Sequence, residues 1–533
     1  MNPPWWQTAV FYQIYPRSFA DSNGDGIGDL DGITAHLDYL NDGTGRSLGI
    51  DAIWLSPINP SPLKDWGYDV SDYCGIHPEL GDLPSFDRLL AEAHRRKIRI
   101  ILDLVPNHTS DQHPWFVESR SSRRNPKRDW YIWVASEPDR PPNNWLSAFG
   151  GPAWEYDAVT ASWFMHSFLK EQPDLNYRNP EVAEAMHAAI GFWLDRGVDG
   201  FRVDVISYLM KDAALRDNPP RTDSSVFTLR DPRGLQLHLY DQELPEAHDV
   251  IRGFRRVLDR YRDRMMVGEV WVREQKSLAA FLRPDQIQLA FNFRFLMCPW
   301  EAAAFRNVIE ESEEILPPKS GAWPTYTLSN HDFPRHLSRY QSGGETEARA
   351  RAAIVMLLTV RGTPFLYYGE EIGMRDVNVP FFAARDKVGR DQCRTPMQWS
   401  AGKNGGFSIS DQPWLPVGDC AAINVERQRD DDGSMLGLYR RLIRLRKKTP
   451  ALLDGSYRAI PAPDDCLVFC RERPDGKEVQ SAMVAINFAS AERRFDSPPG
   501  TMLLSTIEGR EGESISGSLR LAANEAVIIE AAR

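Results

Sequence analysis

Four apolar runs of the sequence end in side chains that can bind or transfer a proton. Single polar residues end strands in many proteins, but four runs that finish in titratable groups are hard to explain that way. If the runs are parallel strands of a barrel, their carboxyl ends meet at one mouth, where such barrels hold their active sites. The runs are 101–108 (ILDLVPNH), 200–204 (GFRVD), 267–269 (VGE) and 327–332 (TLSNHD).

Asp204 and Glu269 follow consecutive predicted strands, so we expect them to be neighbours on the rim. Cleavage of a glycosidic bond uses two carboxyl groups. One attacks the anomeric carbon and the other protonates the leaving oxygen, and a spacing of about 5 Å retains configuration. Arg202 lies on the same side of its strand as Asp204 and would keep that carboxylate ionised. The partly apolar surroundings of Glu269 favour its protonated form. An ion pair that only stabilises the barrel is the alternative for Arg202 and Asp204.

Eight short apolar runs must position these residues. Several are apolar on both faces, as expected of parallel strands buried between a core and a layer of helices. Helical patterns at 85–97, 180–196, 248–261 and 346–360 alternate with them, so the sequence predicts a TIM (β/α)8 barrel, an α/β fold. The runs are 9–15, 52–55, 98–105, 200–205, 265–270, 287–293, 325–328 and 364–368.

Two segments lie outside this repeat. The interval 109–176 is too long for a βα loop and holds clusters of Pro and Trp, so we expect an inserted domain after the third strand. From residue 451 short alternating runs predict a C-terminal antiparallel β-sandwich domain. The predicted boundaries are 1–106 and 177–450 for the barrel, 107–176 for the insertion and 451–533 for the C-terminal domain.

The composition excludes several classes of protein. Of the 533 residues, 42% are hydrophobic and 26% are charged, an ordinary globular balance. The 63 basic residues against 74 acidic ones give a net charge of -11, which argues against a general binder of nucleic acid or anionic membranes. The 6 cysteines are scattered and form no CxxC pair. No run reaches the length of a membrane span and no secretory signal is visible, so we expect a soluble cytoplasmic protein.

The motifs resemble those of glycoside hydrolase family 13, the α-amylase family. The resemblance rests on DLVPNH at 103–108, GFRVD at 200–204, GEV at 268–270 and SNHD at 329–332, in that order. A fifth motif, QPDLN at 172–176, is similar to the signature of the oligo-1,6-glucosidase and α-glucosidase subgroup. The resemblance covers nearly the whole chain and implies a barrel with a domain inserted after the third strand.

The resemblance implies a role for each motif residue. Asp204 matches the nucleophile, Glu269 the general acid/base, and Asp332 the third carboxylate, which binds hydroxyls of the distorted sugar. An arginine and an aspartate at the blind end of the pocket fit an exo-acting enzyme better than an endo-acting one. The residues that match the family's substrate-binding side chains are Asp65, Tyr68, His108, Phe149, Phe168, Arg202, His331, Arg390 and Arg394.

Residues 21–29 (DSNGDGIGD) place oxygen ligands at alternating positions with glycines at the bends, like the first nine positions of an EF-hand loop. The twelfth position is Gly32, which excludes a true EF-hand. The resemblance implies a structural Ca²⁺ or Mg²⁺ site on this loop, and catalysis itself needs no cofactor. An acidic turn without metal is the alternative. The implied ligands are the side chains of Asp21, Asn23, Asp25 and Asp29 and the carbonyl of Ile27.

Two positions bear on the substrate. In this subgroup the residue after the nucleophile tends to be Val in α-1,6-acting enzymes and Thr in strict α-1,4-acting ones, so Val205 favours isomaltose-type linkages. Trp271 stands where the isomaltase-like pattern often has a smaller or polar residue. Its ring would reshape the leaving-group side of the pocket and could favour an aromatic or sugar acceptor. Asn107 matches a Ca²⁺ ligand of true α-amylases, and no metal is expected there.

These observations predict a retaining exo-acting α-glucosidase that releases α-glucose from short α-glucosides through a covalent glucosyl-Asp intermediate. The linkage leans toward α-1,6, with α-1,4 or sucrose open. An α-glucosyltransferase or sucrose isomerase with the same intermediate is the nearest alternative, although an Arg-Leu-Asp-Arg-Asp stretch typical of isomerases is missing. A non-catalytic binding module and an endo-acting α-amylase are further alternatives. The expected partner is a small-molecule substrate, with no nucleic acid and no membrane, for a monomer or homodimer.

Overall fold

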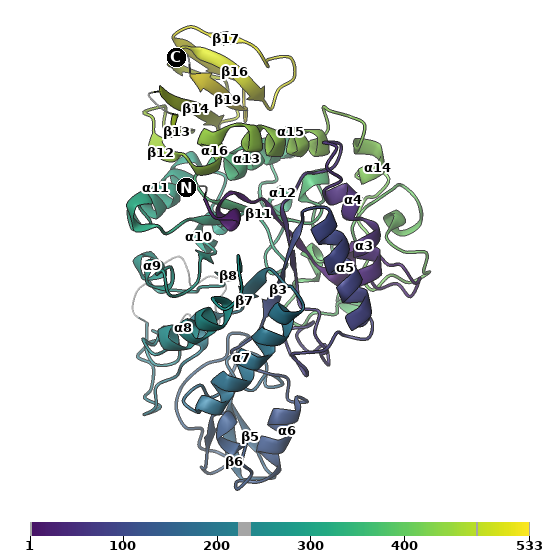
Figure 1. Cartoon of the computed structure of the whole chain (residues 1–533), viewed down its shortest axis with the longest axis vertical. Helices are drawn as coiled ribbons and strands as arrows, with labels where there is room; N and C mark the ends of the chain where they lie inside the picture. Colours follow the sequence, from purple (N-terminus) through teal and green to yellow (C-terminus); the bar gives the residue numbers. More distant parts are fainter. Residues whose placement is uncertain (1–2, 222–235, 476–477, 532–533) are drawn as a thin grey trace. The chain divides into compact units, whose positions relative to one another are not determined.

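The computed structural model describes residues 3–221, 236–475 and 478–531 and has the element order of a barrel with two additions (Figure 1). Eight parallel strands form one sheet in the order β10-β11-β1-β2-β3-β7-β8-β9. A parallel bridge joins Phe291, directly after β9, to Thr325 of β10, so the barrel nearly closes and the eight predicted strands are confirmed. The strands are β1 (Phe11–Ile14), β2 (Ala52–Leu55), β3 (Arg99–Leu104), β7 (Gly200–Val203), β8 (Met265–Gly268), β9 (Leu289–Ala290), β10 (Thr325–Thr327) and β11 (Thr363–Tyr367).

The barrel strands are buried on both faces, since every residue of β1, β2, β7, β8 and β11 is buried. The four predicted helices are present with ends shifted by at most three residues: α5 (Leu83–Arg95), α7 (Pro180–Asp195), α8 (Ala247–Leu258) and α13 (Thr346–Thr359). Helix α7 begins where the side chain of Asn179 accepts the backbone N–H of Glu181 and Pro180 occupies the first turn.

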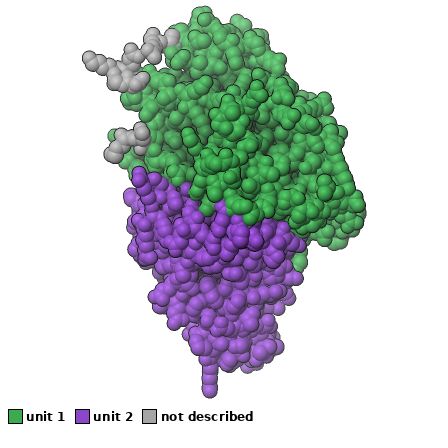
Figure 2. Space-filling model, turned by 45° about the vertical axis from the view of Figure 1, so that its right-hand side comes forward, with its two compact units in different colours: residues 1–54, 88–100, 291–533 green, residues 55–87, 101–290 purple. Residues whose placement is uncertain are grey.

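By packing, the chain forms two compact units, which Figure 2 colours green and purple. The first comprises residues 1–54, 88–100 and 291–533, and the second comprises residues 55–87 and 101–290. These units are not the predicted domains, and the boundaries at 106/107, 176/177 and 450/451 stay predictions.

The inserted segment after β3 carries its own antiparallel sheet, in the order β4 (Trp133–Val134), β6 (Ser162–Met165) and β5 (Trp154–Asp157). Trp145, Trp154 and Trp163 form its core with Ala153 and Met165. Isolated antiparallel bridges join His108 to Asp174 and Tyr131 to Leu175. The insertion therefore leaves the barrel and returns to it at neighbouring points.

The C-terminal region is a β-sandwich, as predicted. A six-stranded sheet has the order β12 (Ser456–Ala459), β13 (Cys466–Asp475), β14 (Glu478–Asn487), β19 (Ala526–Ala531), β16 (Gly500–Ser505) and β17 (Ser514–Ile515). The strands β15 (Arg493–Asp496) and β18 (Ser518–Leu521) pair separately. Alternate residues of β13, namely Cys466, Val468 and Cys470, share one core with Leu519 and Leu521 of the second sheet.

Over the described ranges, no helix combines the length and the apolar character that crossing a membrane requires. The cytoplasmic location stays a prediction from the sequence.

Candidate active site

The ends of three neighbouring strands hold one buried arginine among three carboxylates. A nitrogen of the Arg202 guanidinium, on β7, lies 2.7 Å from Oδ1 of Asp103 and 2.5 Å from Oδ1 of Asp204. The other terminal nitrogen donates to Oε2 of Glu269. The exposed fractions of Arg202, Asp204 and Glu269 are 2%, 5% and 6%, so little water screens these charges. The structure thus confirms that Asp204 and Glu269 are neighbours, and Arg202 bridges them.

Burial dominates the electrostatics of Asp204. Desolvation raises the pKa of its carboxyl group, the Arg202 guanidinium lowers it, and the charge of Glu269 raises it again, so the pKa stands well above its usual range. Arg202 therefore favours the ionised form of Asp204, as the sequence predicts, but burial outweighs it, and Arg202 is shared among three carboxylates.

The backbone directly after Asp204 is strained. Val205 has φ 35° and ψ 48°, in the left-handed region that a β-branched residue rarely adopts, at a cost of about 1–3 kcal/mol. The neighbouring hydrogen bonds hold this conformation, because Asp204 N donates to Leu104 O at 2.8 Å and Ile206 N donates to Glu269 O at 3.1 Å. The turn after β7 is thus tied directly to the residue that carries the second carboxyl group.

A second row of side chains continues from Asp103. The Tyr68 hydroxyl donates to Oδ2 of Asp103 at 3.1 Å, and Nε2 of His108 lies 3.2 Å from the carbonyl oxygen of Tyr68. The Gln172 amide donates to Oδ2 of Asp65 at 2.9 Å and lies 3.1 Å from Nε2 of His108. Burial lowers the pKa of His108, which favours the neutral ring.

Aromatic rings extend this row from the insertion. Phe168 lies on His108 with ring centroids 5.1 Å apart, and Phe149 meets Phe168 edge-on at 5.6 Å. On the other side, the Trp271 indole N–H donates to Oε1 of Glu269 at 2.6 Å. The predicted residues Asp65, Tyr68, His108, Phe149, Phe168, Arg202, Asp204, Val205, Glu269 and Trp271 therefore belong to one connected group within the second unit.

The remaining predicted residues gather around Asp332 in the first unit. Arg390 and Arg394 each place a nitrogen 3.1 Å from Oδ1 of Asp332, and Nε2 of His331 lies 3.2 Å from Oδ2. The Arg394 side chain is fully buried, whereas that of Asp332 is 25% exposed and can be reached by a ligand. Burial raises the pKa of the neighbouring Asp386, but Arg390 outweighs it and holds the value at about 2. Because Arg390 and Arg394 already hold the Asp332 carboxylate, it can accept hydrogen bonds from hydroxyl groups without a rearrangement of these side chains.

Two buried residues make polar contacts around the candidate site that the sequence-based reasoning did not anticipate. Gln172 belongs to the recognised QPDLN motif, but its contact with Asp65 was not expected. The other is Lys211, whose ammonium lies 2.5 Å from Asp174 Oδ2, 2.9 Å from Asn107 Oδ1 and 2.5 Å from the carbonyl oxygen of Tyr208. Lys211 is only 4% exposed. This buried cation therefore contacts Asn107, the residue that the resemblance matches to a Ca²⁺ ligand of true α-amylases.

The predicted metal loop is tightly turned. Asp21 accepts the backbone N–H groups of Asn23, Gly24 and Gly26, and Asp29 accepts that of Gly32 at the start of α3 (Leu30–Ala35). Gly24 and Gly26 have φ of 85° and 94°, and a side chain on Gly26 would collide with the carbonyl of Gln412. The donor set of carboxylates, amide and carbonyl suits a hard cation. In the described part of the chain, however, no three His, Cys, Asp or Glu side chains already converge as metal ligands.

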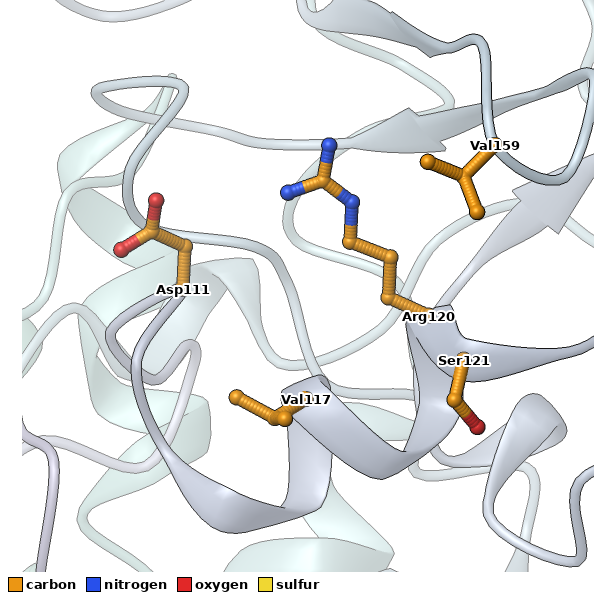
Figure 3. A pocket seen from close by; sticks show the side chains of 5 residues that line it. All are labelled: Asp111, Val117, Arg120, Ser121 and Val159. Atoms are coloured by element: carbon orange, nitrogen blue, oxygen red, sulfur yellow. The ribbon is translucent and has the colours of Figure 1, made fainter.

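A surface pocket of about 250 Å³ opens beside α6 (Pro114–Ser121) in the insertion and contains none of the predicted site residues (Figure 3). Its lining residues are Asp111, Val117, Arg120, Ser121 and Val159. Arg120 already pairs with the buried Asp157 at 2.8 Å. We therefore assign the pocket no part in the candidate active site.

Comparison with known proteins places the chain in a family. Residues 13–455 match the family described as "Alpha amylase, catalytic domain". A probable α-glucosidase of Rhizobium meliloti strain 1021 is 42% identical over 89% of this chain and 88% of the relative. An oligo-1,6-glucosidase of Parageobacillus thermoglucosidasius is 38% identical over 93% of both chains.

Solved structures agree with this assignment. An α-glucosyl transfer enzyme, XgtA, superposes with a TM-score of 0.92 at 38% identity and covers 100% of both chains. The trehalulose synthase MutB of Pseudomonas mesoacidophila MX-45 gives a TM-score of 0.88 at 34% identity and covers 99% of this chain and 100% of its own. The chain therefore belongs to the α-amylase family, glycoside hydrolase family 13.

Proposed function

We propose that this protein is a retaining exo-acting α-glucosidase that releases α-glucose from the non-reducing end of short α-glucosides. The observation that carries the proposal is the bridge from Arg202 to both Asp204 and Glu269 at adjacent strand ends. Two buried carboxyl groups beside each other suit a double displacement, which needs one ionised and one protonated carboxyl group.

In the proposed reaction, an oxygen of Asp204 attacks the anomeric carbon while Glu269 gives its proton to the glycosidic oxygen, and the bond between that oxygen and the anomeric carbon breaks. A water molecule then gives a proton to Glu269, and the oxygen of that water attacks the anomeric carbon. The bond between the anomeric carbon and Asp204 breaks, which releases α-glucose. Arg202 offsets the negative charge of the pair. Trp271, which donates to Glu269, orients the acid/base.

Recognition of a terminal glucose follows from the charged groups. Asp65, held by Gln172, and Asp332, held by Arg390 and Arg394, offer fixed carboxylates to sugar hydroxyls. A terminal residue has hydroxyl groups that an internal residue of a chain has already used in linkages. The similarity to a probable α-glucosidase supports the same proposal.

We propose a preference for α-1,6 linkages, supported by Val205 and by the similarity to an oligo-1,6-glucosidase. Transfer of the glucosyl group to a sugar is the second candidate. It is supported by the similarity to an α-glucosyl transfer enzyme and to a trehalulose synthase, and by the Trp271 ring beside Glu269.

Maltose, isomaltose and sucrose, each followed by proton NMR from the first minutes, test these proposals. Early α-glucose, fastest from isomaltose, is the expected result. Fast release from maltose or sucrose with slow release from isomaltose would indicate that Trp271, and not Val205, determines the linkage preference. Accumulating oligosaccharides or isomerised sucrose would favour the transferase, and early β-glucose would contradict retention. No turnover of any of the three would contradict the α-glucosidase.

We further propose that the loop of residues 21–29 binds one Ca²⁺ or Mg²⁺ that stabilises the fold. Asp21, Asn23, Asp25, Asp29 and the carbonyl of Ile27 would hold it, and no catalytic step uses it. Removal of metal with EDTA should lower the melting temperature, and Ca²⁺ or Mg²⁺ should restore it. An Asp25→Ala variant should melt at the same temperature with and without EDTA. If EDTA leaves the wild-type melting temperature unchanged, the loop is an acidic turn.

A further inference from the structure

The turn that carries Asp332 is held from behind by one histidine. His336, the first residue of α12 (His336–Arg339), donates its backbone N–H to the Ser329 hydroxyl oxygen at 2.9 Å. Its ring Nδ1 lies 3.2 Å from the same oxygen. Both residues are buried, His336 completely. Ser329 is therefore fixed from two directions by a single residue.

The turn transmits this position to the site. Thr327 donates its hydroxyl to the carbonyl oxygen of Ser329 at 2.7 Å, and Asn330 Oδ1 accepts the N–H of Asp332 at 2.9 Å. Arg394 donates to the carbonyl oxygen of His331 at 2.7 Å. With so many fixed hydrogen bonds in a short segment, a shift of Ser329 moves the Asp332 carboxylate.

A buried glutamate, Glu370, lies near the His336 ring and lacks hydrogen-bond donors among the described residues. Oε1 of Glu370 lies 3.7 Å from Nδ1 of His336, and Glu370 is 1% exposed. Among the residues whose placement is described, neither of its two oxygens has a hydrogen-bond donor, and the buried Nε2 of His336 has no partner either. Glu370 follows Gly369, whose φ of 82° turns the chain after β11.

The adjacent glutamate differs at one oxygen. Glu371 is equally buried, and its Oε1 accepts the hydroxyl groups of Tyr12 at 2.8 Å and Tyr39 at 2.7 Å, whereas its Oε2 has no partner among the described residues. A buried carboxylate without donors lowers the stability of a fold. Glu370 has a donor on neither oxygen among the described residues, so its approach to the His336 ring is the contact that a substitution would change.

We propose that Glu370 and His336 are a positioning pair for the turn that carries Asp332. The Glu370 carboxyl group, 3.7 Å from Nδ1, favours by its charge the His336 ring orientation in which Nδ1 carries the proton, and the ring and backbone of His336 fix Ser329. The inference rests on the proposed function, because Asp332 must contact the sugar. We expect the pair to affect the transition state more than substrate binding. The reason is that Asp332 is expected to bind the distorted sugar of the transition state more tightly than the undistorted sugar of the ground state.

The test compares Glu370→Gln with the matched control Glu371→Gln. Glu370→Gln should lower kcat about tenfold with KM within about twofold, and should leave the melting temperature equal or higher because a buried charge is lost. Hydrogen exchange of the amides in residues 329–333 should become faster. Glu371→Gln should lower the melting temperature, because two tyrosine hydroxyls lose an ionised acceptor, and should change neither kcat nor this exchange.

Two variants of His336 keep the inference open to refutation if a glutamate variant fails to fold. His336→Asn places an amide near the position of Nδ1 and should retain more kcat than His336→Leu. Equal kcat losses in both glutamate variants, or an unchanged kcat in Glu370→Gln, would overturn the pair. If the wild-type protein cleaves no α-glucoside, the proposed function fails. The exchange comparison then still decides, and equal exchange in the two variants would overturn the pair.

Discussion

Replacing the buried Lys211 by alanine removes the only ammonium within bonding distance of Asn107 and Asp174 among the contacts described for these two residues. Loss of one partner from a buried ion pair costs about 3–5 kcal/mol. Asp174 keeps two donors, the Ser167 N–H at 2.8 Å and the Ser167 hydroxyl at 2.5 Å, so we expect the lower end, about 3 kcal/mol. Unfolding entropy of about 2.1 cal/mol/K per residue gives about 1 °C per kcal/mol for a chain of 533 residues, so the melting temperature should fall by about 3 °C.

Calorimetry with and without Ca²⁺ tests the reasoning behind that number. Lys211→Ala leaves a carboxylate, an amide oxygen and a carbonyl oxygen around a space, which is a hard-cation environment. Millimolar Ca²⁺ should therefore raise the melting temperature of Lys211→Ala more than that of the wild type. Lys211→Ala/Asp174→Asn should lose less stability than the sum of the single changes and should lose the Ca²⁺ effect. Additive losses, together with a Ca²⁺ effect no larger than in the wild type, would refute the charge argument.

Three further outcomes follow from the site. Asp204→Asn should lower kcat at least about a thousandfold with an unchanged circular dichroism spectrum, and more than a few per cent of residual activity would count against the nucleophile. Burial raises the pKa of Asp204 and the ionised form is the active one, so kcat/KM should fall toward acid with a midpoint above about pH 4. A midpoint at or below that value would contradict the assignment. Burial raises the pKa of Cys393 to about 12, so native protein treated with iodoacetamide at pH 8 should be labelled at the partly exposed Cys74 and Cys420 and not at Cys393, which peptide mass spectrometry checks.

The fold was predictable because each barrel strand is a short apolar run that periodicity alone marks. The strands at 52–55 and 325–328 agree with β2 and β10 to within one residue. Strand β9 is only Leu289–Ala290, although the apolar run extends over 287–293, because the chain turns into α10 (Phe293–Met297). A run of apolar residues predicts burial but does not predict where the pairing of strands ends.

The site was predictable where one motif carries one role, and it was not where several residues share a partner. The pairing of Arg202 with Asp204 follows from their spacing along one strand. Its sharing with Asp103 and Glu269 depends on the register of three strands, so the balance of burial and charge that raises the pKa of Asp204 could not be worked out beforehand. Lys211 has no motif of its own. Its role exists only because the fold brings Asn107 and Asp174 together.

The two ends of the insertion are hydrogen-bonded to each other, which favours exchange of the insertion as one segment. Leu175 N donates to Asn107 O at 2.9 Å and Thr109 N donates to Pro173 O at 3.2 Å, so the two ends are fastened to each other before the chain departs. Doubling the length of a loop closed in this way costs only about 0.6 kcal/mol of closure entropy. We therefore expect the barrel to keep its register when residues 110–172 are lengthened, shortened or exchanged for those of a relative. Because Phe149 and Phe168 belong to this segment, such an exchange would change the aromatic rings next to His108 and leave Asp204 and Glu269 in place.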